Sequence, residues 1–244
     1  MFRDWLIGNM GTPGEYMYRG IHIWSTVAVF AVFGVLVFLG LRYRGNPKAA
    51  KALLLSVALF QLVFEIGWRL IYFFLKGSAL RDLWPMYPCN LGGILLPLFA
   101  IFNLRRGKQM FYLFGFVGGV LTFAMPEGIF TSDVLVFPIL KSILQHTGIL
   151  LSPVLEYVHG SYRPSLRHMG WITAGCIIHA INCEVIARLV LGLDKDFMFF
   201  RSGLPFVIEG VPSFITISVF ALLVLTVLSF LGNIRDSINF LRRK

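Results

Sequence analysis

A cysteine and a histidine are the residues of this sequence that most readily suggest chemistry. Cys89 follows Pro85 and Pro88, and proline is favoured in the first turn of a helix, where its missing N–H is harmless. We therefore predict that Cys89 lies in a first turn, beside backbone N–H groups that could stabilise a thiolate or an oxyanion. His146 could act as its base. Taken alone, each is as well explained as a buried core residue.

Charged and amide side chains inside apolar stretches extend this candidate site. An ionisable residue at membrane depth is costly and usually faces a partner, the bundle interior or water. Two Glu–Arg pairs have the i,i+4 spacing, with Glu first, that favours an ion pair on one helix. Such a pair could bind substrate or could pin two helices together. The predicted site has Cys89 and His146 as catalytic residues and Asn90, Glu65, Arg69, Gln145, Asn182, Glu184 and Arg188 as substrate-binding residues.

The composition requires much of the surface around these residues to face lipid. Of 244 residues, 57% are hydrophobic and only 14% are charged, whereas a soluble domain is about half apolar and about a quarter charged. This excludes a soluble enzyme or a nucleic-acid-binding domain. The net charge of +10 is typical of basic cytoplasmic loops in a membrane protein. The three cysteines form no disulfide or zinc pattern, and we expect neither a metal nor another cofactor.

Seven apolar stretches predict an all-α, polytopic membrane helix bundle, because a spanning helix needs roughly 20 mostly apolar residues. They are 21–41, 52–75, 87–104, 110–125, 136–158, 169–192 and 211–232. Basic residues concentrate in segments that this count places on one side, namely 42–51, 105–109, 159–168 and 233–244. The N-terminus is therefore predicted outside and the C-terminus in the cytoplasm.

This topology divides the chain into three parts. We expect an extracytoplasmic segment over 1–20, a transmembrane domain over 21–232 and a basic cytoplasmic tail over 233–244. The protein is expected to be a multi-pass protein of the plasma membrane. The second and sixth spans both carry Glu four residues before Arg, which could reflect parallel repeats in a 3+1+3 arrangement. The match covers few residues, so coincidence explains it equally well.

The same topology brings the candidate residues to one depth. Cys89 and Asn90 begin the third span from the outer side, and Gln145 and His146 lie about ten residues into the fifth. The acids and bases of the second and sixth spans fall in the outer half as well. Side chains that merely fill a core have no reason to share a depth. Their convergence predicts a site between the helices.

Two sequence motifs resemble the YwaF-like family of integral membrane proteins, which includes animal transmembrane protein 164. Pro85-Met-Tyr-Pro-Cys-Asn-Leu91, at the start of a helix, is similar to the family's Pro-x-x-x-Cys-Asn-Leu segment. Gln145-His-Thr-Gly148 is similar to its helix with a single His-x-Gly. The likeness is best over about 85–165. The chain departs from the family at Tyr87-Pro88, where a His-Leu pair is frequent, and at Asp196-Phe197, where Asn-Tyr is found.

The resemblance implies lipid acyl transfer, with Cys89 and His146 as the catalytic pair. The implied partners are a membrane phospholipid or lysophospholipid and its acyl chain, and no nucleic acid. From the residues alone a second interpretation stays open. The Glu–Arg pairs could belong to a transporter or binding protein for a small polar or zwitterionic solute, without catalysis. A structural or assembly role is a third alternative.

Overall fold

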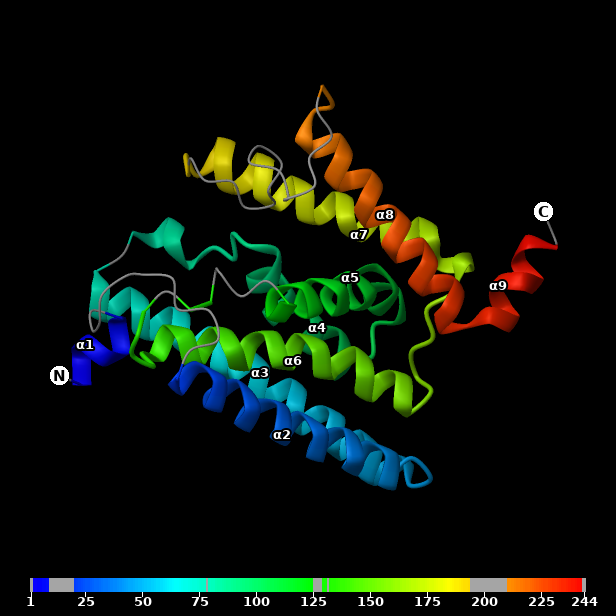
Figure 1. Cartoon of the computed structure of the whole chain (residues 1–244), viewed down its shortest axis with the longest axis horizontal. Helices are drawn as coiled ribbons and strands as arrows, with labels where there is room; N and C mark the ends of the chain where they lie inside the picture. The colour runs from blue at the N-terminus through cyan, green and yellow to red at the C-terminus, as the bar shows by residue number, and fades with distance from the viewer. Residues whose placement is uncertain are drawn as a thin grey trace.

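The described part of the chain is built from helices and their connections (Figure 1). A computed structural model describes residues 2–8, 20–77, 79–124, 129–130, 132–193 and 210–242. The helices are α1 (Phe2–Ile7), α2 (Ile21–Arg42), α3 (Pro47–Lys76), η1 (Leu80–Leu83), α4 (Pro88–Ile101), α5 (Arg105–Ala124), α6 (Phe137–Val158), η3 (Leu166–His168), α7 (Met169–Ala180), η4 (Ile181–Val190), α8 (Ser213–Gly232) and α9 (Ile234–Leu241). The all-α class predicted from the sequence is confirmed.

Each of the seven apolar stretches coincides with a helix, and α7 continues without a break into the π-helix η4. Four helical segments are long and apolar enough to cross a membrane, namely Ile21–Arg42, Pro47–Lys76, Leu166–Val190 and Ser213–Gly232. The helix Pro88–Ile101 is apolar but shorter. The protein is therefore a multi-pass membrane protein. The count of seven spans, their orientation and the repeat stay predictions.

Caps and prolines explain where the helices at the site begin. The side chain of Asn46 accepts a hydrogen bond from the N–H of Ala49 at 3.1 Å and caps α3, and Pro47 occupies the first helical position. Helix α3 therefore begins earlier than its apolar stretch and ends at Gly77, whose φ of 65° is left-handed. Proline also occupies the first turn of α4, as predicted, which places Cys89 there.

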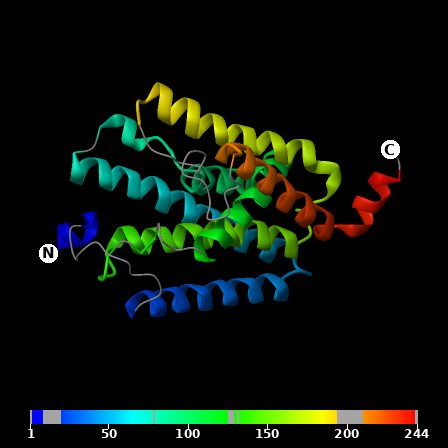
Figure 2. The ribbon, with the colours of Figure 1, turned by 45° about the horizontal axis from the view of Figure 1, so that its top comes forward.

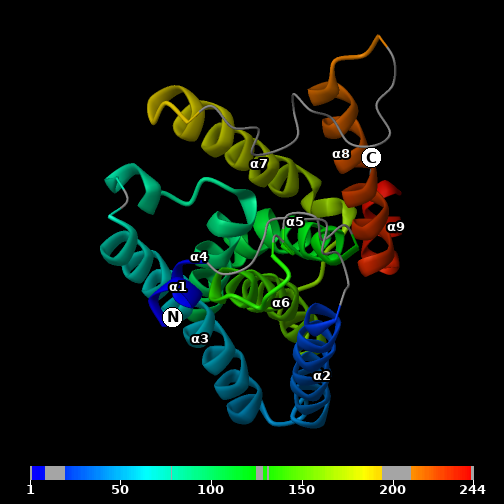
Figure 3. The ribbon, with the colours of Figure 1, turned by 60° about the vertical axis from the view of Figure 1, so that its left-hand side comes forward.

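Helix α6 is the centre of the bundle and packs against α2, α3, α4 and α5 (Figure 3). Because protein rather than lipid surrounds it, α6 can carry buried Lys141, Gln145, His146 and Glu156. These polar residues explain why α6 is not among the four helices that are both long and apolar enough to cross a membrane. Helix α2 behaves in the opposite way, because it leaves most of its apolar side chains exposed.

Helices α7 and α8 lie on the far side of α5 from α2 (Figures 1 and 3). There α7 and α8 pack against α5 and against each other. Helices α1 and α9 lie at opposite ends of the molecule (Figure 2). The turn between α2 and α3, the connection after α6, and α9 share one end. Ser165 donates to Asp236 at 2.6 Å and fixes α9 to the connection after α6.

Candidate active site

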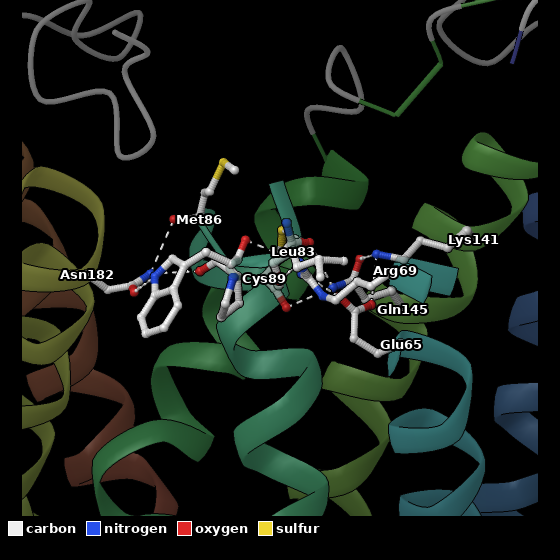
Figure 4. A network of polar contacts seen from close by, with 11 residues as sticks. Glu65, Arg69, Leu83, Met86, Cys89, Lys141, Gln145 and Asn182 are labelled. Atoms are coloured by element: carbon white, nitrogen blue, oxygen red, sulfur yellow. Dashed lines mark hydrogen bonds and ion pairs between the residues drawn. The ribbon is translucent and has the colours of Figure 1, made fainter. Parts of the chain in front are cut away.

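A buried carboxylate shared by two cations organises the polar network at the α1 end of the bundle (Figure 4). Glu65 of α3 has no exposed surface. Its Oε1 accepts hydrogen bonds from Arg69 Nη2 at 2.8 Å and Nε at 3.0 Å. Its Oε2 lies 2.8 Å from Lys141 Nζ, across the interface with α6. The i,i+4 pair expected within one helix is thus part of a three-member cluster.

Gln145 links this cluster to the first turn of α4. Lys141 Nζ donates to Gln145 Oε1 at 2.7 Å. Gln145 Nε2 in turn donates to the carbonyl oxygen of Cys89 at 2.9 Å and to Asn90 Oδ1 at 3.2 Å. Gly93 makes this approach feasible, because a Cβ there would lie 2.9 Å from Gln145 Nε2. The chain from Glu65 to Cys89 is therefore continuous and crosses three helices.

The Cys89 thiol lies close to polar groups of its own turn. Its Sγ is 3.9 Å from Asn90 Oδ1, and the backbone N–H groups of Cys89 and Asn90 lie in the same turn. These N–H groups belong to the first turn, where helical partners are missing. The Cys89 side chain packs against the apolar cluster formed by Leu96, Phe111, Tyr112, Ile149 and Tyr162. This environment can support a nucleophile and donate to an oxyanion.

His146 follows Gln145 directly and has a defined tautomer. Its Nδ1 is 2.7 Å from the carbonyl oxygen of Ser142. Because a carbonyl only accepts, Nδ1 carries the proton and Nε2 keeps the lone pair that a base needs. No hydrogen bond joins the imidazole to the Cys89 thiol in the described part of the chain. The structure brings Cys89 to the residue beside His146, without placing the two catalytic candidates in contact.

The segment that leads into Cys89 is held from both sides. Arg69 Nη1 donates to the carbonyl oxygens of Leu83 and Trp84 at 3.0 and 3.2 Å. From η4, Asn182 Oδ1 accepts from Trp84 Nε1 at 2.8 Å, and its Nδ2 donates to the carbonyl of Pro85 at 2.8 Å. The polar atoms of Asn182 are thus engaged by this segment. Asn182 therefore fixes the backbone of the segment that precedes Cys89.

The match to a protein family covers most of the chain. The model of the TMEM164 family matches residues 17–231. The chain belongs to the TMEM164 family. The resemblance predicted from residues 85–165 is confirmed and extends well beyond them. No curated protein and no solved structure matches the chain. Within this TMEM164-family chain, Asp196-Phe197 lies outside the described residues.

The second Glu–Arg pair stands apart from the network in this TMEM164-family protein. Arg188 Nη1 and Glu184 Oε2 are 2.6 Å apart, with side chains 35% and 22% exposed. Among the described residues, no hydrogen bond or ion pair joins either of them to Glu65 or Cys89. The two pairs therefore make separate contacts in the described part of the chain, and both a shared site and the transporter interpretation stay predictions.

Two residues that complete the site were not assigned to it from the sequence. Lys141 is an ionisable residue four positions before Gln145, and this spacing signals that the two side chains meet on one face. Trp84 carries no comparable signal, because only the fold brings it to Asn182. In the described part of the chain, no group of three or more His, Cys, Asp or Glu side chains could hold a metal ion.

A small polar cavity opens beside the network. It has a volume of about 140 Å³. Its lining comprises Trp68, Arg69, Tyr72, Phe73, Asp82, Leu83, Asn90 and Lys141. Two cations, one carboxylate and an amide thus surround a space next to the turn that carries Cys89. Such a space can take a polar group of a ligand.

Proposed function

We propose that this protein is an integral membrane lipid acyltransferase that acts on phospholipid or lysophospholipid from the outer half of the bilayer. It acts as an acyl-lipid hydrolase when water is the acceptor. One observation carries the proposal, namely the hydrogen bond from Gln145 to the Cys89 carbonyl. It places the first-turn thiol of α4 opposite the α6 residue that precedes His146. Membership of the TMEM164 family supports the same assignment.

The reaction has two balanced steps. His146 Nε2 takes the proton of the Cys89 thiol, and the sulfur attacks the carbonyl carbon of an acyl ester. The N–H groups of Cys89 and Asn90 stabilise the oxyanion. When the ester C–O bond breaks, His146 gives the proton to the leaving lysolipid oxygen. The acyl group is then bound to Cys89 as a thioester. His146 then takes the proton of a lysolipid hydroxyl or of water, whose oxygen attacks the thioester carbonyl. The C–S bond breaks, and His146 returns the proton to the sulfur of Cys89.

The mechanism requires the thiol and the imidazole to approach each other when substrate binds. Hydrogen bonds between catalytic groups are often long in ligand-free enzymes and tighten in the substrate complex. The imidazole is already oriented, because Ser142 holds Nδ1. Substrate binding would have to bring His146 Nε2 to the Cys89 thiol to complete the pair.

The polar cavity suits the lipid phosphate. Lys141 spends two of its three N–H donors on Glu65 and Gln145, so one is left for a ligand. Arg69 spends most of its donors on Glu65 and two carbonyls, so it chiefly shapes the cavity. Asp82 on the cavity wall balances the excess positive charge of Arg69, Lys141 and Glu65, so the remaining Lys141 donor, rather than a net charge, would bind the phosphate.

The distribution of basic residues between the two ends of the helix bundle supports the predicted orientation in the membrane. The turn between α2 and α3, the connection after α6, and α9 all carry basic residues and lie at one end (Figures 1 and 2). The network lies toward the other end, near α1. Positive residues concentrate on the cytoplasmic side of membrane proteins. The catalytic groups are then reached from the outer leaflet.

Transfer of a labelled acyl chain between phospholipid and lysophospholipid in nanodiscs tests the proposal. We expect Cys89→Ala to lower the rate by about a thousandfold or more, the scale of losing a nucleophile. A labelled acyl group should be trapped on Cys89 and detected by mass spectrometry. Cys176→Ala is the matched control and should keep full activity, because Cys176 packs in a separate cluster against α5. A folded Cys89→Ala variant with unchanged transfer would refute the proposal, as would a thiol-directed lipid probe that labels only Cys176 or Cys183.

A further inference from the structure

An apolar groove runs along the outside of the bundle between α2, α3 and α6. Its volume is about 440 Å³, within the range of roughly 300–1,000 Å³ typical of small-molecule sites. Phe33 and Leu36 of α2, Val57 and Phe60 of α3, and Leu151 of α6 form much of its wall. The groove borders α2, whose other apolar faces are exposed. A lipid can therefore enter it sideways from the membrane.

The length of the groove matches one acyl chain. On α3 its lining extends from Leu53 to Glu65, which corresponds to roughly 18 Å of helix at about 1.5 Å per residue. One leaflet contributes roughly half of a hydrocarbon core of about 30 Å. The groove follows the helices and hence the direction of a lipid chain. Its dimensions fit a chain better than a compact polar solute.

Residues with polar side chains lie at one end of the groove. An occupant with one polar end would match this distribution. Glu65 and Gln145 line that end, whereas Leu36 and Leu53 line the other. Gln61 lies one helical turn from Glu65 and is only 4% exposed. Its Oε1 accepts from Ser152 Oγ at 3.3 Å, but its Nε2 is buried without a hydrogen-bond partner in the structure.

A buried amide N–H without an acceptor costs about 1–3 kcal/mol, so this donor calls for an acceptor that the described chain does not supply. An ester carbonyl at the head of an acyl chain is such an acceptor. An alkane-like chain without an oxygen would leave the amide unsatisfied. The orphaned donor thus points to a ligand with one oxygen at the polar end and hydrocarbon beyond it.

We infer that the groove binds one acyl chain of a membrane phospholipid. The ester carbonyl of the chain that is not transferred accepts a hydrogen bond from Gln61 Nε2, and this chain extends along α3 toward Leu53. The head group then faces the Glu65 network and the polar cavity beyond it. This inference deepens the proposed function by stating where the acyl chain lies, and it is tested by binding rather than by turnover.

The experiment uses the full chain in nanodiscs that contain a phosphatidylcholine with a diazirine midway along one acyl chain. After irradiation, mass spectrometry locates the adducts. We expect them to concentrate on groove residues such as Val57, Phe60 and Leu151, well above the level on the exposed apolar face of α8. Adducts spread evenly over α2, α3 and α8 would indicate annular lipid only. A dimer cross-linked through the groove would assign it to a second copy. Either result overturns the inference.

Two substitutions sharpen the test. Ala28 is exposed and lines the groove, whereas Ala31 is exposed on the same helix and does not line it. Ala28→Trp should reduce groove labelling several-fold, and Ala31→Trp should leave it unchanged. Equal labelling in both variants would refute the proposed location. Gln61→Leu should weaken labelling by about two- to tenfold, the value of one hydrogen bond.

The same labelling in the Cys89→Ala variant separates this inference from the proposed function. Labelling should stay at the level of the unmodified protein, because Cys89 does not line the groove. If the groove is labelled while Cys89→Ala keeps full acyl transfer, the catalytic proposal fails and the groove stands. If Cys89 is essential for acyl transfer while the groove is unlabelled, the inference of acyl-chain binding in the groove is refuted and the catalytic proposal stands.

Discussion

Helix α6 carries two buried lysine–glutamate contacts, and they differ in what surrounds them. Near its beginning, Lys141 meets Glu65 of α3 at 2.8 Å. Near its end, Glu156 meets Lys108 of α5 at 2.6 Å. Both carboxylates have no exposed surface. The residue types are the same, so only the setting can give the two clusters different roles.

The Glu156 cluster is closed. Glu156 accepts hydrogen bonds from Tyr112 at 3.4 Å and from Ser161 through its other carboxylate oxygen. Lys108 also donates to Asn103 at 2.9 Å. The cluster joins α5, α6 and the connection after α6, and none of these side chains lines either of the two cavities described above. It has the properties of a structural cross-link between helices.

The Glu65 cluster is open. Glu65 lines the apolar groove, while its partners Arg69 and Lys141 line the polar cavity. Two cations share the carboxylate, and Gln145 connects the cluster to Cys89 by a hydrogen bond to its carbonyl oxygen. A ligand can therefore contact this cluster and change its balance of charge. A buried ion pair that borders a cavity is thus a better candidate for ligand contact than one that is enclosed by protein.

The largest effect on stability is expected from breaking the closed cluster. Glu156→Gln leaves the Lys108 charge buried without its partner, which costs about 3–5 kcal/mol. Glu65→Gln should cost less stability, because both cations retain other partners. Arg69 still donates hydrogen bonds to the carbonyl oxygens of Leu83 and Trp84, and Lys141 still donates to Gln145. Thermal unfolding in detergent measures both. The double variant Lys108→Met/Glu156→Gln should recover much of the loss, since no unpaired charge remains. Equal losses for the two single variants would contradict the distinction between closed and open clusters.

A smaller effect, on the rate of acyl transfer, is expected when Gln145 of the open cluster is replaced, and none is expected when Ser161 of the closed cluster is replaced. Gln145→Met removes the hydrogen bonds to Cys89 and Asn90 and should lower kcat for acyl transfer about tenfold, equivalent to roughly 1.4 kcal/mol. KM should change little, because Gln145 acts here by positioning the nucleophile. Ser161→Ala is the counterpart in the closed cluster and should lower stability but leave kcat unchanged. A loss of kcat in both variants, or in neither, would show that the open cluster does not position Cys89.

The smallest effect is expected at the pair that belongs to neither cluster. The Arg188 side chain is 35% exposed near the end of η4, where a long side chain can reach the membrane interface. Arg188→Gln should cost less than about 1 kcal/mol, as for other exposed ion pairs, and acyl transfer should be unaffected. A strong loss of transfer in this variant would return Glu184 and Arg188 to the substrate site.

Much of the candidate site could be predicted because its residues carry local signals. Pro88 predicts the first turn that holds Cys89, and polar residues in apolar stretches mark Glu65 and Gln145. The pairing of Glu65 with Lys141 could not be predicted, because it depends on how α3 and α6 are rotated about their axes. That the Glu184–Arg188 pair makes no described hydrogen bond to the Glu65 cluster could not be predicted either. Shared depth along the membrane normal does not reveal on which side of the bundle a side chain lies.

The sequence by itself determined the membrane class, the positions of the helices and the family. Each of these follows from composition, from the length of apolar stretches, or from residues adjacent in the chain. The tertiary structure decided which charges meet, that Asn182 clamps the segment before Cys89, and that a groove lies between α2, α3 and α6. These features depend on contacts between helices distant in sequence. A membrane helix with apolar residues on all sides does not show in its sequence which face meets lipid and which meets protein. Only the packing of the helices determines these contacts.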